Sequence, residues 1–308
     1  MGGIRIVGWG TALPDKVITN ADLEARLDTT DEWITERSGI RERRVGGTTT
    51  ELAVGAGRAA LAKAGLEPTN VDLLVLATTT PDQAVPATSA AVSHELGLHC
   101  GGFDLNAACA GFVYSLVAAS GMATGHIRNV LLIGSETLSR VTDWEDRSTA
   151  VLFADGAGAV VLQAVEGPGD LLGWDLGLDG SLRPILYADL GGFIVMEGRE
   201  VFRRAVRATV ESATQALRRS GVSADEIALF VPHQANIRII DAAGQRLGIP
   251  RERTAVVLDR TGNTSSASIP LALADAADAG RLSPGDLVLL SGFGAGMTWA
   301  SAVVRWSA

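Results

Sequence analysis

The segment "DLNAACAGFVYS", residues 104–115, places a lone cysteine, Cys109, where a strand pattern gives way to small residues that begin a helix. The free N–H groups and dipole of a helix N-terminus favour negative charge and lower the pKa of a thiol. They also suit an oxyanion formed when a thiolate attacks a carbonyl. Cysteine is equally common as a buried packing residue, so this segment alone leaves a nucleophile and a core residue open.

The composition predicts a globular protein with an acidic surface. Hydrophobic residues make up 47% of the 308 residues and charged residues 20%, with a net charge of −9. We therefore expect neither nucleic acid nor membrane as a partner, although a local basic patch is compatible with this charge. Cys100 and Cys109 are the two cysteines, and no Cys/His cluster indicates a metal. With no apolar leader and no apolar run of the ~20 residues that span a bilayer, a cytoplasmic protein is expected.

The sequence also contains an internal repeat. "ALAKAGLEPTNVDLLVLATT" begins at Ala60, and "ALRRSGVSADEIALFVPH" begins 156 residues later at Ala216. Each copy is typical of an amphipathic helix, a glycine stop, a polar turn and a buried strand. The same offset pairs Cys109 with Ser265, in a second turn before an Ala-rich helix. Chance echoes are common in α/β proteins, but this ordered series favours a duplicated α/β fold. We predict halves of residues 1–168 and 169–308, joined near the segment 165–173.

Two polar residues of the second half are candidate partners of the thiol. His233 follows the apolar strand "IALFV", at the strand end where open α/β sheets bind ligands. A core or capping histidine is the alternative. Asn263 lies in "TGNTSSASIP", in the loop that the repeat places opposite the Cys109 loop. A cysteine with a histidine and an asparagine elsewhere in the chain is a known nucleophile signature. The remaining histidines are predicted to be exposed: His94, His99 and His126.

Two glycine-rich stretches, "FADGAGAVVL" and "SGFGAGMTWAS", lack GxGxxG spacing and run into strand-like residues. They predict tight turns rather than a nucleotide site. A turn of the second stretch near the thiol would add a backbone N–H for the oxyanion, which we assign to Ala295 beside the N–H of Cys109 itself.

In order and spacing, "AACAGF", "VPHQAN" and "GNTSSAS" resemble the thiolase-fold condensing enzymes, most closely the β-ketoacyl-acyl-carrier-protein synthase III family. "NADLEARLDTTDEWITERSGIRERR", "DRSTAVLFADGAGAVVL" and "GFGAGMTW" extend the resemblance over nearly the whole chain. It implies a five-layer αβαβα thiolase fold of two duplicated halves, in a homodimer. It implies an acyltransferase that moves an acyl group from acyl-CoA to Cys109. Malonyl carrier protein (malonyl-ACP) then loses CO₂ and condenses with that group, which initiates fatty acid synthesis. No metal or other cofactor is implied.

The resemblance also implies roles for residues outside the turn of the thiol. His233 and Asn263 would donate hydrogen bonds to the malonyl thioester oxygen. Trp33 and Arg147 match positions that hold the CoA adenine, and Arg37 matches a neighbouring CoA contact. Ordinary surface residues are the alternative. Three arginines match a basic rim that docks the acidic carrier protein, with a solvated helix face as the alternative: Arg203, Arg238 and Arg246.

Two departures from the family concern the acyl group. Many members carry Phe where this chain has Val85, and that Phe reaches into the partner's acyl pocket; the smaller Val85 predicts a wider or deeper pocket. The segment between "GLDGS" and "MEGREVF" is shorter than usual, so its part in the pocket wall is open. Other possible functions are a starter-unit synthase or an acyltransferase of secondary metabolism. A non-catalytic carrier-protein-binding homologue is disfavoured, because such a protein needs no intact Cys, His and Asn.

Overall fold

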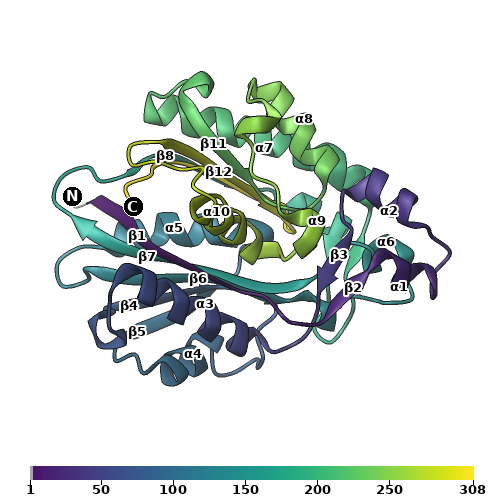
Figure 1. Cartoon of the computed structure of the whole chain (residues 1–308), viewed down its shortest axis with the longest axis horizontal. Helices are drawn as coiled ribbons and strands as arrows, with labels where there is room; N and C mark the ends of the chain where they lie inside the picture. Colours follow the sequence, from purple (N-terminus) through teal and green to yellow (C-terminus); the bar gives the residue numbers. More distant parts are fainter. Residues whose placement is uncertain (1–2) are drawn as a thin grey trace.

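The computed structural model describes residues 3–308 as two β-sheets that alternate with three layers of helices (Figure 1). The first sheet has the strand order β1–β7–β6–β4–β5, with β4 parallel to both of its neighbours and β7 antiparallel to both of its own. Its strands are β1 (Gly3–Ala12), β4 (Leu73–Ala77), β5 (Gly101–Leu105), β6 (Asn129–Thr137) and β7 (Asp155–Val165).

The second sheet repeats the first. Its order is β11–β12–β13–β8, with β11 parallel to β12 and the other pairs antiparallel. Where β5 would stand, β11 forms a single parallel bridge between Phe230 and Thr254. The strands are β8 (Leu171–Leu178), β11 (Ile227–Pro232), β12 (Leu287–Gly294) and β13 (Thr298–Arg305). The predicted thiolase fold of two duplicated α/β halves agrees with this arrangement.

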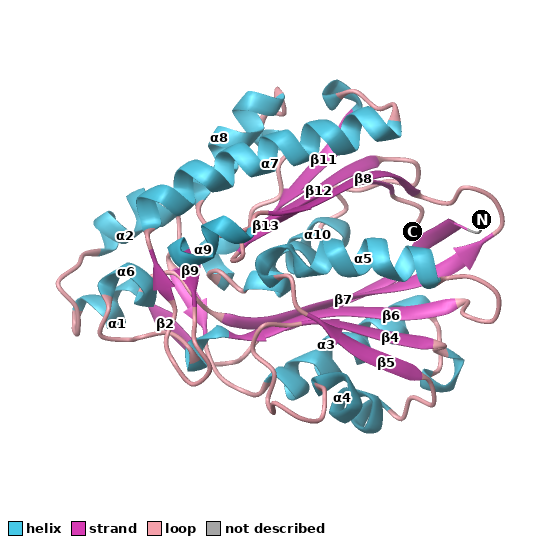
Figure 2. Ribbon diagram, turned by 180° about the vertical axis from the view of Figure 1, so that it is seen from behind, coloured by secondary structure: helices cyan, strands magenta, loops and turns pink. Residues whose placement is uncertain are grey.

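Helices cover the outer faces of both sheets and fill the space between them (Figure 2). The helices α3 (Thr49–Ala64) and α4 (Thr88–Leu96) cover the first sheet, and α7 (Gly198–Ser220) and α8 (Ile237–Leu247) cover the second. The middle layer contains α5 (Gly111–Met122) and α10 (Ser268–Asp278). Both middle helices carry few charges, as expected for helices buried on all sides.

The turns that precede the two middle helices are equivalent, but with an offset one residue longer than the sequence predicted. Each turn is a short 3₁₀ segment, Ala108–Ala110 or Ser265–Ala267, and each begins with a residue in the left-handed region, at φ 49° and 48°. The counterpart of Cys109 is therefore Ser266, and the prediction of Ser265 was wrong. Leu73 of β4 and its counterpart Leu229 of β11 are 156 residues apart, whereas the two turns are 157 apart, so the second half has one more residue between this strand and its turn.

Smaller elements gather at one end of the layers, at the right of Figure 1. They are β2 (Val17–Thr19), α1 (Asn20–Glu24), α2 (Asp31–Ser38), β3 (Glu42–Arg44), α6 (Arg147–Ala150), β9 (Leu186–Tyr187) and β10 (Val195–Met196), with α9 (Leu258–Thr261) close by. Residues 166–170 link β7 in one sheet to β8 in the other. The division into residues 1–168 and 169–308 stays a prediction. Within residues 3–308 no helix is long and apolar enough to cross a membrane.

Candidate active site

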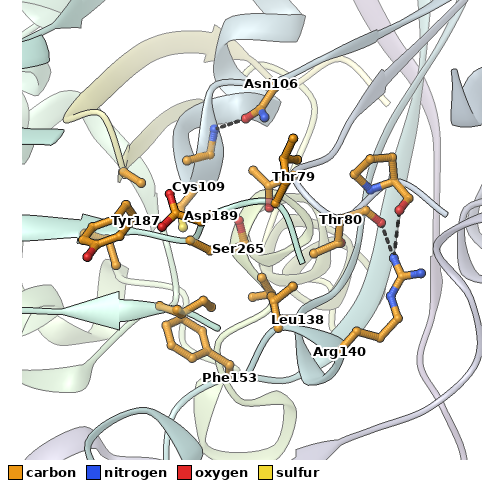
Figure 3. Close-up of a pocket in the computed structure, with 18 of the residues that line it drawn as sticks. Thr79, Thr80, Asn106, Cys109, Leu138, Arg140, Phe153, Tyr187, Asp189 and Ser265 are labelled. Carbon is orange, nitrogen blue, oxygen red and sulfur yellow. Dashed lines mark hydrogen bonds between the residues drawn. The ribbon is translucent and has the colours of Figure 1, made fainter. Parts of the chain in front are cut away.

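Cys109 lies in the sharp turn between β5 and α5, at the N-terminal end of the middle-layer helix. The preceding residue, Ala108, adopts the strained left-handed conformation, and its N–H donates to Asn106 Oδ1 at 3.2 Å (Figure 3). Cys109 is half-buried. Its own backbone N–H and the Ser265 hydroxyl both interact with the thiol. The helix N-terminus that the sequence predicted is therefore present.

The protonation of the thiol differs from the prediction. Burial raises the pKa of Cys109 to about 12, and the interactions with Ser265 and with the N–H only partly offset this; the nearby Glu136 raises it further. The predicted lowering of the pKa by the helix end was wrong in direction, because desolvation outweighs the helix N-terminus. The free thiol is consequently protonated at neutral pH.

His233 directly follows β11 and is buried, with 2% of its surface exposed. Its Nδ1 lies 2.6 Å from Ser268 Oγ, the first residue of α10. That hydroxyl also accepts the Gln234 N–H at 3.3 Å, which favours donation of its one proton to Nδ1. The proton of the ring then resides on Nε2. Burial lowers the pKa of His233 to about 3, so the imidazole is a neutral hydrogen-bond donor at pH 7. The Phe293 ring packs edge-on against it at 5.3 Å.

Asn263 is fixed by both its backbone and its side chain. Its N–H donates to Leu152 O at 2.9 Å, and its carbonyl accepts from Ala154 N at 2.9 Å. Its Oδ1 accepts the Ser265 N–H at 2.9 Å, so the amide Nδ2 is the group left to donate elsewhere. The two backbone hydrogen bonds fix the position of Asn263, and the bond to Oδ1 orients its side chain.

Cys109 is the meeting point of two cavities. The first, which we call the Trp33 cavity, has a volume of about 530 Å³, and its lining includes Trp33, Cys109, His233 and Asn263. The three residues of the predicted catalytic set therefore face one space. The second, the Tyr187 cavity, has a volume of about 710 Å³ and is lined by Cys109 and Tyr187 among others (Figure 3). Ala295 also belongs to its lining. A substrate that enters through one cavity can reach the thiol and extend into the other.

The end of β12 lies against the turn that contains Cys109. A Cβ on Gly294 would lie 2.5 Å from the Cys109 nitrogen, so only glycine allows this approach. Ala295 follows directly and lines the Tyr187 cavity. The Ala295 carbonyl accepts from the Thr298 hydroxyl, which also donates to Ala107 O. The Thr298 hydroxyl thereby links the backbone at Ala295 to the backbone just before the Cys109 turn. The N–H groups of Ala295 and Cys109 are the predicted oxyanion donors.

The predicted CoA-contact residues gather at the outer end of the Trp33 cavity. The guanidinium carbons of Arg37 and Arg147 lie 4.8 and 4.7 Å from the Trp33 ring centroid. Arg147 also donates to the Asp28 carbonyl at 2.6 Å. Arg37 and Trp33 line the cavity itself.

The predicted basic rim is only partly at the cavity. Arg238 lines the Trp33 cavity and stacks over Phe202 at 5.5 Å. Arg203, on the exposed face of α7, pairs with Glu200, and Arg246 is exposed near the end of α8, outside the cavity lining. Arg199 also lines the cavity and was missed, although the same basic stretch of α7 pointed to it.

The predicted acyl-pocket residue projects outward. Val85 is 85% exposed and lies outside the lining of the Tyr187 cavity, whereas Gln83 and Ala84 belong to it. The shortened segment does form part of the wall, with Leu186, Tyr187 and their neighbours to Gly191. Cys100, interpreted as structural, is half-buried and directly precedes β5. The exposed positions predicted for His94, His99 and His126 are confirmed.

Known proteins share both this sequence and this structure. Residues 103–180 match the family described as 3-Oxoacyl-[acyl-carrier-protein (ACP)] synthase III, and residues 217–306 match its C-terminal family. A Beta-ketoacyl-[acyl-carrier-protein] synthase III of Roseiflexus castenholzii is 49% identical over 98% of both chains. The crystal structure of the 3-oxoacyl-[acyl-carrier-protein] synthase III from Aquifex aeolicus superposes with a TM-score of 0.96 at 46% identity, over 99% of this chain and 100% of that one.

A third neighbour comes from secondary metabolism. It is the priming beta-ketosynthase from the R1128 polyketide biosynthetic pathway, with a TM-score of 0.94 and 38% identity over 99% of this chain and 96% of that one. Full-length identity near one half, together with the shared fold, decides the assignment. The chain belongs to the β-ketoacyl-acyl-carrier-protein synthase III family of thiolase-fold acyltransferases.

Proposed function

We propose that this enzyme transfers an acyl group from acyl-CoA to Cys109 and then condenses it with malonyl-ACP to give a 3-oxoacyl-ACP, CoA and CO₂. The observation that carries the proposal is that Cys109, His233 and Asn263 line one cavity, and that a second cavity begins at the same thiol. The reaction needs no metal or redox cofactor. Within residues 3–308 no cluster of three or more His, Cys, Asp or Glu residues is arranged as a metal site.

In the first half-reaction the Cys109 sulfur attacks the thioester carbonyl. The N–H groups of Cys109 and Ala295 hold the oxygen while it carries negative charge. The bond from carbon to the CoA sulfur breaks, and the thiol proton of Cys109 leaves with CoA as its thiol. CoA would occupy the Trp33 cavity, with its adenine against Trp33 between cationic side chains, and the acyl chain would extend into the Tyr187 cavity.

In the second half-reaction malonyl-ACP replaces CoA in the Trp33 cavity. His233 Nε2 and Asn263 Nδ2 donate hydrogen bonds to the malonyl thioester oxygen, where enolate charge develops as CO₂ leaves. The enolate carbon attacks the acyl–Cys109 carbonyl, and the sulfur departs and takes up a proton. A neutral His233 suits this role, because its pKa of about 3 keeps it uncharged before and after the step.

A starter-unit synthase of secondary metabolism is the second candidate. The 38% identity to the R1128 priming ketosynthase supports it, and the chemistry at the thiol would be the same. The choice rests on the acyl donor and the carrier protein. The acyltransferase alternative differs in chemistry, because an alcohol or amine would then discharge the acyl enzyme.

We also propose a homodimer in which Val85 approaches the partner's acyl cavity. Several large apolar side chains in and near the two segments that carry Val85 and Leu190 are exposed, and a monomeric protein rarely exposes an apolar patch of this kind. They are Val85, Leu190, Phe193 and Val195. Light scattering on the eluting protein tests this, with twice the 31.9 kDa chain mass as the expected result and a single chain mass as the contrary one.

The proposed reaction is tested by intact mass spectrometry after mixing the protein with acetyl-, branched and medium-chain acyl-CoA. An acyl adduct that Cys109→Ala abolishes, and that malonyl-ACP discharges as a 3-oxoacyl-ACP, is expected. An adduct that persists with malonyl-ACP but leaves on addition of alcohols or amines would establish the acyltransferase instead. The preferred acyl-CoA reports the size of the acyl cavity.

A further inference from the structure

Glu136 is a fully buried carboxylate close to the thiol that the proposed reaction does not use. It lies near the end of β6 and has no exposed surface. Its Oε2 accepts hydrogen bonds from the hydroxyls of Thr78, Thr79 and Thr80 and from two of their backbone N–H groups. Its Oε1 lies 2.8 Å from the Ser266 hydroxyl. Within residues 3–308 it forms no salt bridge, so neutral donors alone hold the charge.

These contacts join two walls of the active site. Thr79 and Thr80 line the Tyr187 cavity (Figure 3). Ser266 lies in the Ser265–Ala267 turn. The first residue of this turn, Ser265, donates its N–H to Asn263 Oδ1 and interacts through its side chain with the thiol of Cys109. Ser265 holds a left-handed backbone conformation that is unfavourable outside glycine and asparagine, and such a conformation persists only where the surroundings enforce it.

The internal repeat shows how the two halves differ at this position. Glycines of equivalent strands lie against equivalent turns: a Cβ on Gly134 would meet Ser266 O at 2.4 Å, and one on Gly292 would meet Cys109 O at 3.0 Å. Two residues further along, β12 carries Gly294, whereas β6 carries Glu136. Gly294 lets the β12 backbone approach the Cys109 turn closely, whereas the Glu136 side chain extends to the Ser266 hydroxyl of the equivalent turn.

We propose that Glu136 is a positioning residue that ties the Ser265–Ala267 turn to the Thr78–Thr80 wall and thereby fixes the Asn263 amide for the condensation step. The expected effect on the condensation rate rests on the proposed function. Among residues 3–308, the Ser266 hydroxyl has one other hydrogen-bond partner, the backbone carbonyl of Ala77 at 2.9 Å, so loss of the contact with Glu136 leaves the turn less firmly held. Acylation uses the opposite turn and depends less on it.

The Ser266 hydroxyl suggests two informative substitutions. It has one proton and two acceptors, Ala77 O and Glu136 Oε1. In Glu136→Gln the amide can donate to Ser266 while Ser266 donates to Ala77, so the tie persists but the charge is removed. In Ser266→Ala the charge persists and the tie is cut. The pair therefore separates position from charge.

Single-turnover rates of Cys109 acylation and of condensation are to be measured for both variants, with Asp155→Asn as the matched control. Asp155 is another buried carboxylate with neutral donors, Ser139 and the Gly46 N–H, on the neighbouring strand. We expect Ser266→Ala to slow condensation by about tenfold while acylation changes by less than about threefold, as for a misplaced catalytic group. Glu136→Gln and the control should keep the wild-type ratio of the two rates. A wild-type ratio in Ser266→Ala would overturn the proposal.

A second measurement does not depend on catalysis. In a Cys100→Ser background, the rate of alkylation of Cys109 by iodoacetamide at pH 8 reports thiolate content. Glu136→Gln removes a negative charge beside the thiol and should raise this rate at least about threefold. Ser266→Ala and Asp155→Asn should leave it within about twofold of wild type. An unchanged alkylation rate in folded Glu136→Gln would show that the carboxylate is too far from Cys109 to affect its thiol, and this would contradict the proposed position of Glu136. If wild type forms no acyl adduct, the reaction scheme fails, while this result still tests the position of Glu136.

Discussion

Ser268 Oγ lies 2.6 Å from His233 Nδ1 and connects the first turn of α10 to the imidazole that faces the Trp33 cavity. Because Ser268 also accepts the Gln234 N–H, its proton is directed at Nδ1, and Nε2 keeps the ring proton for the substrate. A middle-layer helix therefore sets the tautomer of the His233 imidazole.

Ser268→Ala tests that role. Without the hydroxyl, the ring has no partner that selects the Nε2–H tautomer, and condensation should slow by about tenfold or more. Acylation of Cys109 should change much less, and intact mass spectrometry measures both steps. Equal slowing of the two steps, or none, would refute the assigned role of Ser268.

The stability of the fold should depend on pH through His233. Its pKa is about 3 in the folded chain against about 6.5 unfolded, so the unfolded state binds more protons between these values. The contribution of the neutral ring is fully present above pH 6.5 and is lost as the pH falls toward 3. The free energy of unfolding should decrease by as much as about 1.4 kcal/mol per pH unit in that window.

Urea unfolding of wild type and of His233→Asn at several pH values measures this slope. Other carboxylates also titrate below pH 6.5, so the difference between the two proteins is the informative quantity. Wild type should lose more stability than the variant between pH 6.5 and 4. Parallel curves would mean that the ring is not buried in its neutral form.

Trp33→Ala should weaken binding of acyl-CoA without changing chemistry at the thiol. Loss of the aromatic ring that Arg37 and Arg147 contact should raise the KM for acyl-CoA about tenfold. The KM for acyl-pantetheine, which lacks the nucleotide, should not change. Trp174→Phe, at an exposed tryptophan on β8, is the control. A rise in KM for both substrates would show a general disturbance of the cavity.

Gly294→Ala should impair the acylation of Cys109. The added Cβ would lie 2.5 Å from the Cys109 nitrogen and 2.8 Å from Ala108 Cβ, so backbone must move. Acylation should fall by about 100-fold or more, since displaced oxyanion donors and thiol both lose their alignment. Gly121→Ala in α5 meets no atom within 4 Å and should acylate at the wild-type rate. Normal acylation in Gly294→Ala would contradict the described approach of β12.

Much of this site was predictable because its residues stand at the ends of elements with clear patterns. His233 follows an apolar strand, and Cys109 and Asn263 lie in turns rich in small residues, so their gathering follows from the repeat. Glu136 ends the apolar strand "NVLLIGSE" and carried the same signal as His233, but it was overlooked. Ser268 gave no signal, because a serine before an Ala-rich helix is ordinary.

The remaining differences come from properties that a linear pattern does not contain. The Cys109 thiol is buried where β12 and Ser265 of the second half pack against its turn, and this burial reverses the expected direction of its pKa. The extra residue between β11 and its turn shifts the counterpart of Cys109 from Ser265 to Ser266. Both the solvation and the register are set by tertiary packing.

The most direct test of the account is the fate of the acyl enzyme in Asn263→Ala. The variant is mixed with acyl-CoA, its mass is followed over time, and malonyl-ACP is then added beside a wild-type sample. The account predicts that both proteins gain the acyl group at similar rates and that only wild type discharges it as a 3-oxoacyl-ACP. Failure of the variant to acylate, or discharge at the wild-type rate, would contradict the assignment of Cys109 to acylation and of Asn263 to condensation.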